Sequence, residues 1–373
     1  MDVTLKGGAF VIDGKPTFIA AAEIQYFRTR RGLWRRILRL AKEAGCNAVA
    51  SYFPWSWHEP EADKTDFTGR THPNRDVVRF VKMVRDEGLM LVVKPGPYVY
   101  GEIADGGVPN WVRQARPEIM ALGPDGRPPV YPKTPPVTYL HPSYLEAVRG
   151  WYGRFIDGVT VGLDNVLMWQ VDNETSYDYM MTTHQGMAVD YNPWLFDSGL
   201  YAAFLREKLG TVARMNRRYG ARHRRFEDVQ PPRDLGPTEA DALRLSDWLE
   251  FKGWMVAHFH KRLADMLYDF GVPGPFSANE PLVRSITYLP TIQRIYSDDR
   301  YAMGLTHVDH FGEITHSHVG EFLANVENYT HWTGSPILGN VEGQASNIAG
   351  MWGQPGRNLG VYFRMLPAKG MNL

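Results

Sequence analysis

Polar residues follow several of the short apolar runs of this sequence, at the point where each run ends. Asn173 and Glu174 come soon after the run Asn165–Val171, and Glu342 directly follows the run Ile337–Val341. Other run ends carry aromatic, amide, imidazole or further carboxyl groups: Tyr52, Tyr98, Glu102, Asn279, Glu280, Asp309 and His310. Carboxylates, aromatic rings and amides gathered on one rim would suit a carbohydrate pocket, although other chemistries use the same groups.

Paired carboxyl groups are sufficient to hydrolyse a glycosidic bond. One protonates the leaving oxygen, and the other attacks the anomeric carbon or activates water. Burial and mutual repulsion push the two pKa values apart, so that one group is protonated and the other ionised. Glu174 and Glu342 are the candidate pair, and Asn173 offers an amide to a sugar 2-hydroxyl. From the pattern alone, Glu342 is equally compatible with a surface or ion-paired role, and Asp172 is expected to face away from the pocket because neighbours on a strand alternate.

The elements that must position these residues alternate between β-type runs and amphipathic helical patterns. Three helices are predicted early in the chain, over Leu33–Ala44, Arg75–Glu87 and Pro142–Asp157. Eight strands are predicted, over Thr17–Ala22, Asn47–Phe53, Leu89–Lys94, Asn165–Val171, Pro275–Ala278, Leu305–His310, Ile337–Val341 and Val361–Met365. This alternation predicts an α/β fold, a (β/α)8 barrel whose functional residues lie at the carboxyl ends of the strands.

The segment from Trp194 to Gly271 is mostly helical, with a long amphipathic stretch over Trp248–Phe270 after the Pro-rich Gln230–Pro237. We expect it to elaborate a single barrel spanning residues 1–373, and a separate helical domain is the alternative. The sequence ends at Leu373, soon after the eighth predicted strand, so the eighth helix is expected to be missing. An exposed flank of this kind predicts a homo-oligomer or a partner chain that covers the open end.

Composition narrows the classes of partner. Lys plus Arg and Asp plus Glu both number 41 among 373 residues, so charge gives no reason to expect nucleic acid or a membrane as partner. The single cysteine, Cys46, excludes an intrachain disulfide. The first residues lack the pattern of a signal peptide, and no apolar run reaches membrane-spanning length. A cytoplasmic location is the resulting expectation.

Other catalytic classes lack their motifs. No dinucleotide fingerprint, P-loop or GxSxG elbow is present, and no cofactor is expected. A metal site can be imagined from a group of possible ligands: His307, Asp309, His310, Glu313, His316 and His318. Neither an HExxH motif nor a Cys/His pairing supports such a site. We therefore expect no metal, and His310 is interpreted as a hydrogen-bond partner of a sugar or a carboxylate.

The first half of the chain contains a series of motifs in order: Glu23–Arg28, Trp55–Glu61, Pro95–Tyr98 with Gly101-Glu102, Gly106–Pro109 and Gln170–Glu174. In these motifs the chain resembles family 35 glycoside hydrolases, the β-galactosidases. Such a resemblance implies galactose contacts from Tyr52, Glu102 and Asn173.

The second half resembles family 42 β-galactosidases at Phe204–Thr211, Asn279, Asp309–Phe311 and Val341–Gln344. Both families belong to one retaining clan, which implies Glu174 as acid/base and Glu342 as nucleophile. The carbohydrate substrate is expected to contact Tyr52, Tyr98, Glu102, Asn173, Asn279, His310 and Trp352.

Several positions depart from the family patterns. Gln25 stands where a histidine is usual, Ile103 where a tryptophan is usual, and Asp172 where a glutamate is usual. The resulting hypothesis is hydrolysis of a terminal β-D-galactoside by double displacement. Three alternatives stay open: another β-glycoside such as a glucoside, mannoside or xyloside, transglycosylation, and a non-catalytic sugar-binding barrel. Glu280 and Glu327 are the next candidates for the nucleophile.

Overall fold

The computed structural model describes residues 1–6, 9–99, 103–129, 137–173, 175, 189–234, 236–281, 301–306 and 337–339. For residues 279–281, 301–306 and 337–339, it describes the backbone alone. The eighth predicted strand, Val361–Met365, lies outside the described residues.

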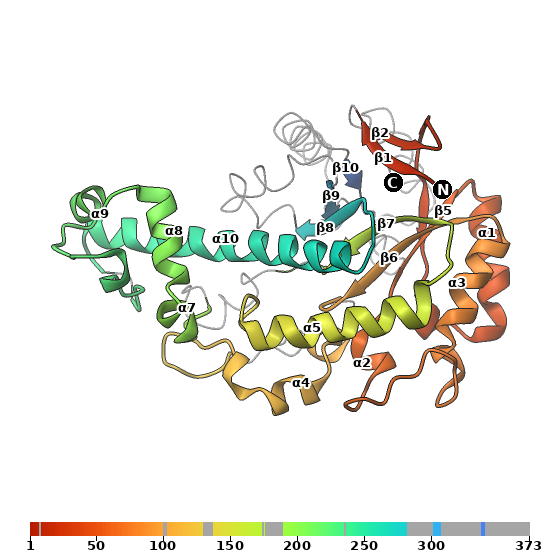
Figure 1. Cartoon of the computed structure of the whole chain (residues 1–373), viewed down its shortest axis with the longest axis horizontal. Helices are drawn as coiled ribbons and strands as arrows, with labels where there is room; N and C mark the ends of the chain where they lie inside the picture. The colour runs from red at the N-terminus through yellow and green to blue at the C-terminus, as the bar shows by residue number, and fades with distance from the viewer. Residues whose placement is uncertain are drawn as a thin grey trace, which may run out of the picture.

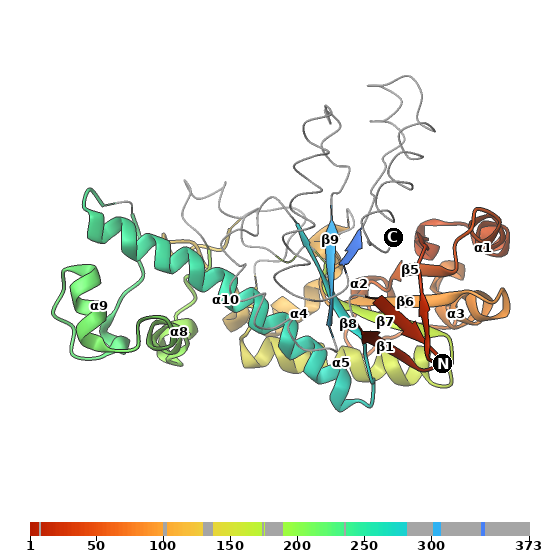
Figure 2. The same cartoon turned by 90° about the horizontal axis from the view of Figure 1, so that it is seen from above.

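A parallel sheet forms the centre of the molecule (Figures 1 and 2). Its strands lie side by side in chain order, and each pairs in parallel with the next. They are β4 (Ala21–Glu23), β5 (Ala48–Tyr52), β6 (Met90–Gly96), β7 (Val166–Val171), β8 (Phe276–Pro281), β9 (Tyr301–Thr306) and β10 (Ile337–Gly339). A parallel sheet in chain order, with helices in the connections, is the arrangement of a (β/α)8 barrel.

Helices in the connections between the strands confirm the three early predictions to within a few residues: α1 (Trp34–Glu43), α3 (Val77–Asp86) and α5 (Pro142–Phe155). Short helices occupy other parts of the loops: α2 (Trp55–His58), α4 (Asn110–Ala115), and the 3-10 turns η1 (Tyr26–Arg28), η2 (Arg31–Leu33), η3 (Pro73–Arg75), η4 (Ala104–Gly107) and η5 (Pro117–Ile119). A π-helical turn, η6 (Ile156–Thr160), extends α5. Outward-facing strand residues such as Val49, Val93 and Trp169 are buried in one core with α3 and α5 residues.

A small antiparallel sheet precedes the barrel, and the sequence pattern did not predict it. It consists of β1 (Val3–Lys6), β2 (Ala9–Ile12) and β3 (Lys15–Thr17). Phe10 from β2 is fully buried in an inner core with residues near the amino ends of the barrel strands, among them Ala48 and Met168. The predicted first strand, Thr17–Ala22, is therefore wrong in its bounds, because Thr17 ends β3 and the barrel strand begins at Ala21.

The segment after β7 is helical, as predicted. It contains α7 (Trp194–Asp197), α8 (Leu200–Leu209), α9 (Val212–Tyr219), η7 (Phe226–Asp228) and α10 (Glu239–Asp269). In both views α8 and α9 lie at one end of the molecule and α1 and α3 at the other (Figures 1 and 2). Helix α10 begins earlier than the predicted Trp248, because Thr238 and Asp241 form a capping box at its amino end. Whether residues 1–373 fold as one domain remains a prediction.

A buried carboxylate joins the helices of this segment. Asp247 on α10 accepts two hydrogen bonds of 2.8 Å from the guanidinium of Arg218 and one of 2.7 Å from the hydroxyl of Tyr219. The ammonium of Lys208 on α8 lies 2.9 Å from the same carboxylate. Burial alone would raise the pKa of Asp247, but these hydrogen bonds hold it below the ordinary value. Asp247 therefore links α8, α9 and α10 as an ionised group.

Replacing Asp247 with alanine should destabilise the helical segment by about 3 kcal/mol, because Arg218 and Lys208 would lose the buried charge that compensates them. Denaturant unfolding would measure the loss, and hydrogen exchange would locate it in α8–α10. Asp86→Ala is the matched control, because it removes an acid from the exposed ion pair Lys82–Asp86 and should leave unfolding unchanged. Equal effects of the two variants would contradict this account of Asp247.

Candidate active site

Three of the predicted site residues lie together at the carboxyl edge of the sheet. Tyr52 is the last residue of β5, Tyr98 follows β6, and Asn173 follows β7. Because β5, β6 and β7 are neighbours in the sheet, their ends place these residues at one edge. Asn279 lies in β8, for which the backbone alone is described at this position. The other predicted site residues lie outside the described residues: Glu102, Glu174, His310, Glu342 and Trp352.

Asp172 joins the ends of β6 and β7. Its backbone N–H donates to the carbonyl of Gly96 at 3.2 Å. One carboxylate oxygen accepts the backbone N–H of Tyr98 at 2.6 Å, and the other accepts the hydroxyl of Thr175. The Asp172 backbone adopts φ +55°, a left-handed conformation that Asp and Asn tolerate better than most residues. Asp172 is 1% exposed, so its charge is used to hold this corner, which we name the β6–β7 corner (residues 96–99, 170–173 and 175).

Asn173 is held inside the β6–β7 corner by hydrogen bonds on both ends of its amide. Its oxygen accepts from the side-chain amide of Gln170 at 3.2 Å, and its nitrogen donates to the carbonyl of Val99 at 3.3 Å. Its side chain is buried. The residue that immediately precedes position 174 therefore has a fixed amide.

An ion pair that the sequence pattern did not single out lies beside Tyr52. The ammonium of Lys94, at the end of β6, is 2.5 Å from the carboxylate of Glu23 at the end of β4. It also lies 4.8 Å from the centre of the Tyr52 ring. Gln25 donates to the second oxygen of Glu23 at 2.7 Å. The sequence contains one sign of this ion pair, because Lys94 is the one charged residue in the apolar run that forms β6.

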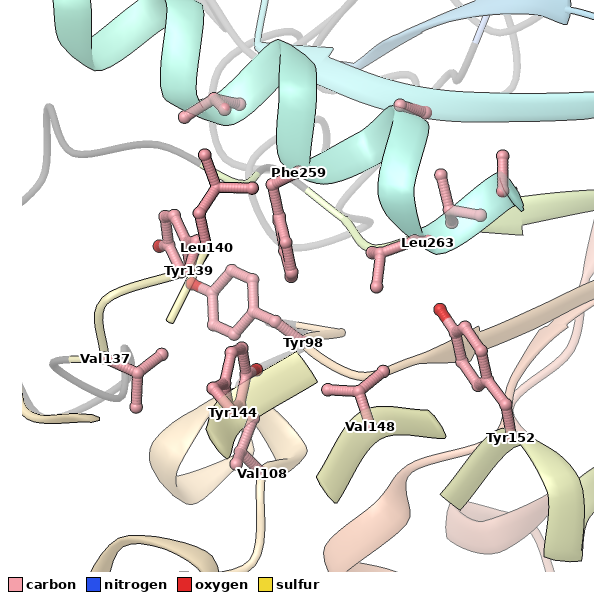
Figure 3. Close-up of a cluster of buried hydrophobic side chains, with 14 of the residues drawn as sticks. Tyr98, Val108, Val137, Tyr139, Leu140, Tyr144, Val148, Tyr152, Phe259 and Leu263 are labelled. Atoms are coloured by element: carbon pink, nitrogen blue, oxygen red, sulfur yellow. The ribbon is translucent and has the colours of Figure 1, made fainter. Parts of the chain in front are cut away.

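Tyr98 lies in a buried hydrophobic cluster (Figure 3). Figure 3 shows its ring among Tyr139, Tyr144 and Phe259, which come from the segment before α5, from α5 and from α10. Burial, and then the negative charge of Asp172, raise the pKa of Tyr144 well above its ordinary value, so its hydroxyl stays neutral. Because it lies in this buried cluster, the ring of Tyr98 contributes to packing. Its predicted contact with sugar stays a prediction.

His58 and Glu59, in the loop after β5, have side chains of types that often serve in catalysis, yet here they stabilise that loop. The ring nitrogens of His58 contact the carbonyl of Asp66 at 2.7 Å and the hydroxyl of Tyr26 at 2.5 Å. Glu59 accepts from the indole of Trp55 and the guanidinium of Arg154 on α5, both at 2.7 Å. Both side chains are fully buried. The loop after β5 is thereby fixed onto α5.

Sequence comparison identifies relatives of this chain. The model of "Glycosyl hydrolases family 35" matches residues 9–122, a range that contains Tyr52 and Tyr98. An exo-β-D-glucosaminidase from Pyrococcus horikoshii is 33% identical over 286 residues, covering 75% of this chain and 36% of that protein. A β-1,2-glucosyltransferase from Ignavibacterium album is 29% identical over 321 residues, covering 83% of this chain and 44% of that protein. The chain thus spans less than half the length of these two relatives.

Solved structures share the fold. The catalytic domain of a β-amylase from Paenibacillus polymyxa matches with a TM-score of 0.65 and 13% identity, covering 91% of this chain and 90% of that one. A catalytic mutant of a GH42 β-galactosidase from G. stearothermophilus matches with a TM-score of 0.57 and 14% identity, covering 83% of this chain and 42% of that one. These likenesses confirm the predicted fold class, an α/β barrel.

The chain belongs to the clan of glycoside hydrolases that holds families 35 and 42. Within this clan member, the part matched by the family 35 model runs from β2 to the loop after η5. It includes the Glu23–Lys94 pair, the buried His58 and Glu59, and the β6 side of the β6–β7 corner. The match therefore covers much of the framework beneath the candidate site.

In the part of the chain that the structure describes, no group of three His, Cys, Asp or Glu side chains is placed to hold a metal ion. Among the helices described, none is both long and apolar enough to cross a membrane. The histidines imagined as metal ligands, His307 to His318, lie outside the described residues.

His58 should make the clan member less stable in mild acid. Burial lowers the pKa of His58 from 6.5 to about 4, so between these values the unfolded chain binds a proton that the folded chain does not. The free energy of unfolding should therefore fall by about 3 kcal/mol as the pH drops from 6.5 to 4. Denaturant unfolding of wild type and His58→Gln across this range gives the free energy of unfolding at each pH. The free energy should fall more steeply with falling pH in the wild type than in the variant, and parallel curves would contradict this role of His58.

Asp172→Ala should destabilise the protein by about 2–4 kcal/mol, because it leaves the Tyr98 N–H without its acceptor and places a residue less tolerant of positive φ at this position. Asp172→Asn should cost markedly less, since asparagine tolerates the same backbone and keeps an accepting oxygen. Urea unfolding of the two variants makes the comparison. Equal losses would show that the hydrogen bonds of this carboxylate do not hold the corner.

Proposed function

We propose that this chain carries the catalytic barrel of a retaining β-glycosidase. The observation that best supports the proposal is the parallel order of β7 and β10, which directs the carboxyl ends of both strands to one edge of the sheet. Positions 174 and 342 follow those two ends in the sequence. Retaining enzymes need two carboxyl groups about 5–5.5 Å apart across a bound sugar. Membership of the clan supports Glu174 as the acid/base and Glu342 as the nucleophile.

The reaction would proceed by double displacement. Glu342 attacks the anomeric carbon and forms a glycosyl-enzyme while Glu174 protonates the leaving oxygen. Glu174 then removes a proton from water, which attacks the anomeric carbon and releases the sugar. Asn173 hydrogen-bonds the 2-hydroxyl, an interaction that strengthens as positive charge develops on the ring. Tyr52, at the same edge, is proposed to contact the sugar as well.

A terminal β-D-galactoside is the proposed substrate. The family 35 match over residues 9–122 supports it, and relatives named β-galactosidase match up to 39% of the chain. Gluco-configured β-glycosides are the second candidate, because the exo-β-D-glucosaminidase and β-1,2-glucosyltransferase relatives match 75% and 83% of the chain. A screen of nitrophenyl β-glycosides that includes galactoside, glucoside and glucosaminide distinguishes these sugars. Turnover of none of them would favour a non-catalytic sugar-binding barrel.

Glu342→Gly should lower kcat on the preferred nitrophenyl glycoside by about 10⁴-fold or more, because no group remains to form the glycosyl-enzyme. Added azide should restore turnover and yield a glycosyl azide of inverted configuration, because azide enters the space of the lost carboxylate. Glu174→Ala should instead give a glycosyl azide of retained configuration. NMR of the products assigns the configuration.

The matched control for both variants is Glu61→Gln, which removes an exposed carboxylate ion-paired with Lys64 and should keep wild-type kcat. Full activity of Glu342→Gly would sink the assignment of the nucleophile. Glu280 and Glu327 would then be tested in the same way.

Transfer of the sugar to an acceptor is a second candidate reaction, because one relative is named a β-1,2-glucosyltransferase. Both reactions share the glycosyl-enzyme, and they differ in whether water or a sugar hydroxyl attacks it. Incubation with a donor glycoside and a free sugar, followed by product analysis, separates the two. A disaccharide as the main product would support transfer.

A further inference from the structure

Two side-chain amides lie in series between two backbone carbonyls in the β6–β7 corner. The nitrogen of Gln170 donates to the carbonyl of Asp172 at 3.0 Å and to the side-chain oxygen of Asn173 at 3.2 Å. The nitrogen of Asn173 donates in turn to the carbonyl of Val99 at 3.3 Å. The series therefore runs from one backbone carbonyl to the other through Gln170 and Asn173.

The two carbonyls determine which way both amides point. A carbonyl only accepts hydrogen bonds, so the group of Gln170 that faces Asp172 must be its nitrogen. If the Asn173 amide were reversed, its nitrogen would face the nitrogen of Gln170, and its oxygen would face the carbonyl oxygen of Val99. Both contacts would then be repulsive. The orientation of Asn173 thus follows from backbone groups, with Gln170 as the intermediate.

Gln170 reaches Asn173 from the inner side of the barrel. Its neighbours on β7, Trp169 and Val171, are buried in the outer core with the helices, so alternation along the strand places Gln170 on the opposite face. It is paired in register with Ser277 of β8 and is 6% exposed. The buried amide of Gln170 hydrogen-bonds residues 172 and 173. It can therefore affect substrate binding through Asn173 without contacting the substrate itself.

We propose that Gln170 is a positioning residue that fixes the Asn173 amide for recognition of a sugar 2-hydroxyl. The inference rests on the proposed function, because it assumes that Asn173 reads that hydroxyl. Gln170 holds the oxygen of Asn173 and the peptide that joins Asp172 to Asn173. Loss of its donor removes one of the two contacts that distinguish the two amide orientations, so the response to the 2-hydroxyl should fall.

The test compares an aryl β-glycoside that the wild type hydrolyses with its 2-deoxy analogue. The ratio of the two kcat/KM values measures recognition of the 2-hydroxyl and cancels general losses of activity. Gln170→Met, which keeps the length of the side chain and removes the donor, should lower this ratio by about 10-fold to 100-fold. A merely structural role would lower both kcat/KM values together and leave the ratio unchanged, which would overturn the proposal.

Gln170→Glu provides an independent measurement with the shape of the side chain preserved. Its ionised carboxylate cannot donate to the two oxygens, whereas the protonated form can donate to one of them. The ratio should therefore rise as the pH falls through the pKa of the introduced carboxyl, and the ratio for Gln170→Met should not change with pH. A ratio for Gln170→Glu that equals the wild-type ratio at every pH would also overturn the proposal.

Ser277→Ala is the matched control. Ser277 lies beside Gln170 in register, and its buried hydroxyl has no hydrogen-bond partner among the described residues. The ratio should stay at the wild-type value in this variant, and a fall equal to that of Gln170→Met would refute a specific role for Gln170. A wild type that hydrolyses no aryl β-glycoside overturns the proposed function and this inference with it. An active wild type whose ratio is insensitive to Gln170 overturns the inference alone.

Discussion

The carboxylate of Asp172 is a buried charge at the place where β6 and β7 end. A buried charge is costly unless charge-assisted hydrogen bonds compensate it, and here the Tyr98 N–H and the Thr175 hydroxyl do so. These partners stand on opposite sides of the corner, so satisfying the charge also fixes the distance between the two strand ends. Asn173 follows Asp172 directly, so its place at the carboxyl edge depends on the hydrogen bonds of the Asp172 carboxylate. The candidate site therefore rests on a carboxylate that does not take part in the proposed reaction.

Other polar residues near the carboxyl edge also stabilise the structure and take no part in the proposed reaction. His58 and Glu59 have catalytic side chains, yet both are fully buried and bonded to the loop and to α5. Lys94 is buried as well, but it points toward Glu23 and Tyr52 from the end of β6. Residue type did not separate these cases. Hydrogen-bond partners did, because both ring nitrogens of His58 and both carboxylate oxygens of Glu59 are bonded within the protein.

The sequence predicted the parallel sheet well, because strands covered on both faces are near-continuous apolar runs with recognisable ends. It failed at Thr17–Ala22, where one apolar run contains the end of β3 and the start of β4. The predicted strand Leu305–His310 starts too late, since β9 already includes Tyr301 and Gly304 interrupts the apolar pattern. Residues 307–310 of that prediction lie outside the described residues. The ends of the apolar runs placed Tyr52 and Asn173 at the carboxyl edge. The pattern gave no sign of Gln170 as a partner of Asn173, because periodicity gives the direction of a side chain and not what that side chain contacts.

Reaction type and sugar preference depend on different parts of this molecule. In the sequence, the two proposed catalytic carboxyl groups follow the ends of β7 and β10, and the topology of the sheet sets where those ends lie. The orientation of Asn173 follows from the backbone carbonyls of Asp172 and Val99 through Gln170. The other hydroxyls of a sugar must be read by side chains on the loops after the strands, which vary more readily than strands do. This explains why relatives with differently named substrates can share the framework, and why clan membership supports a reaction more strongly than it supports galactose.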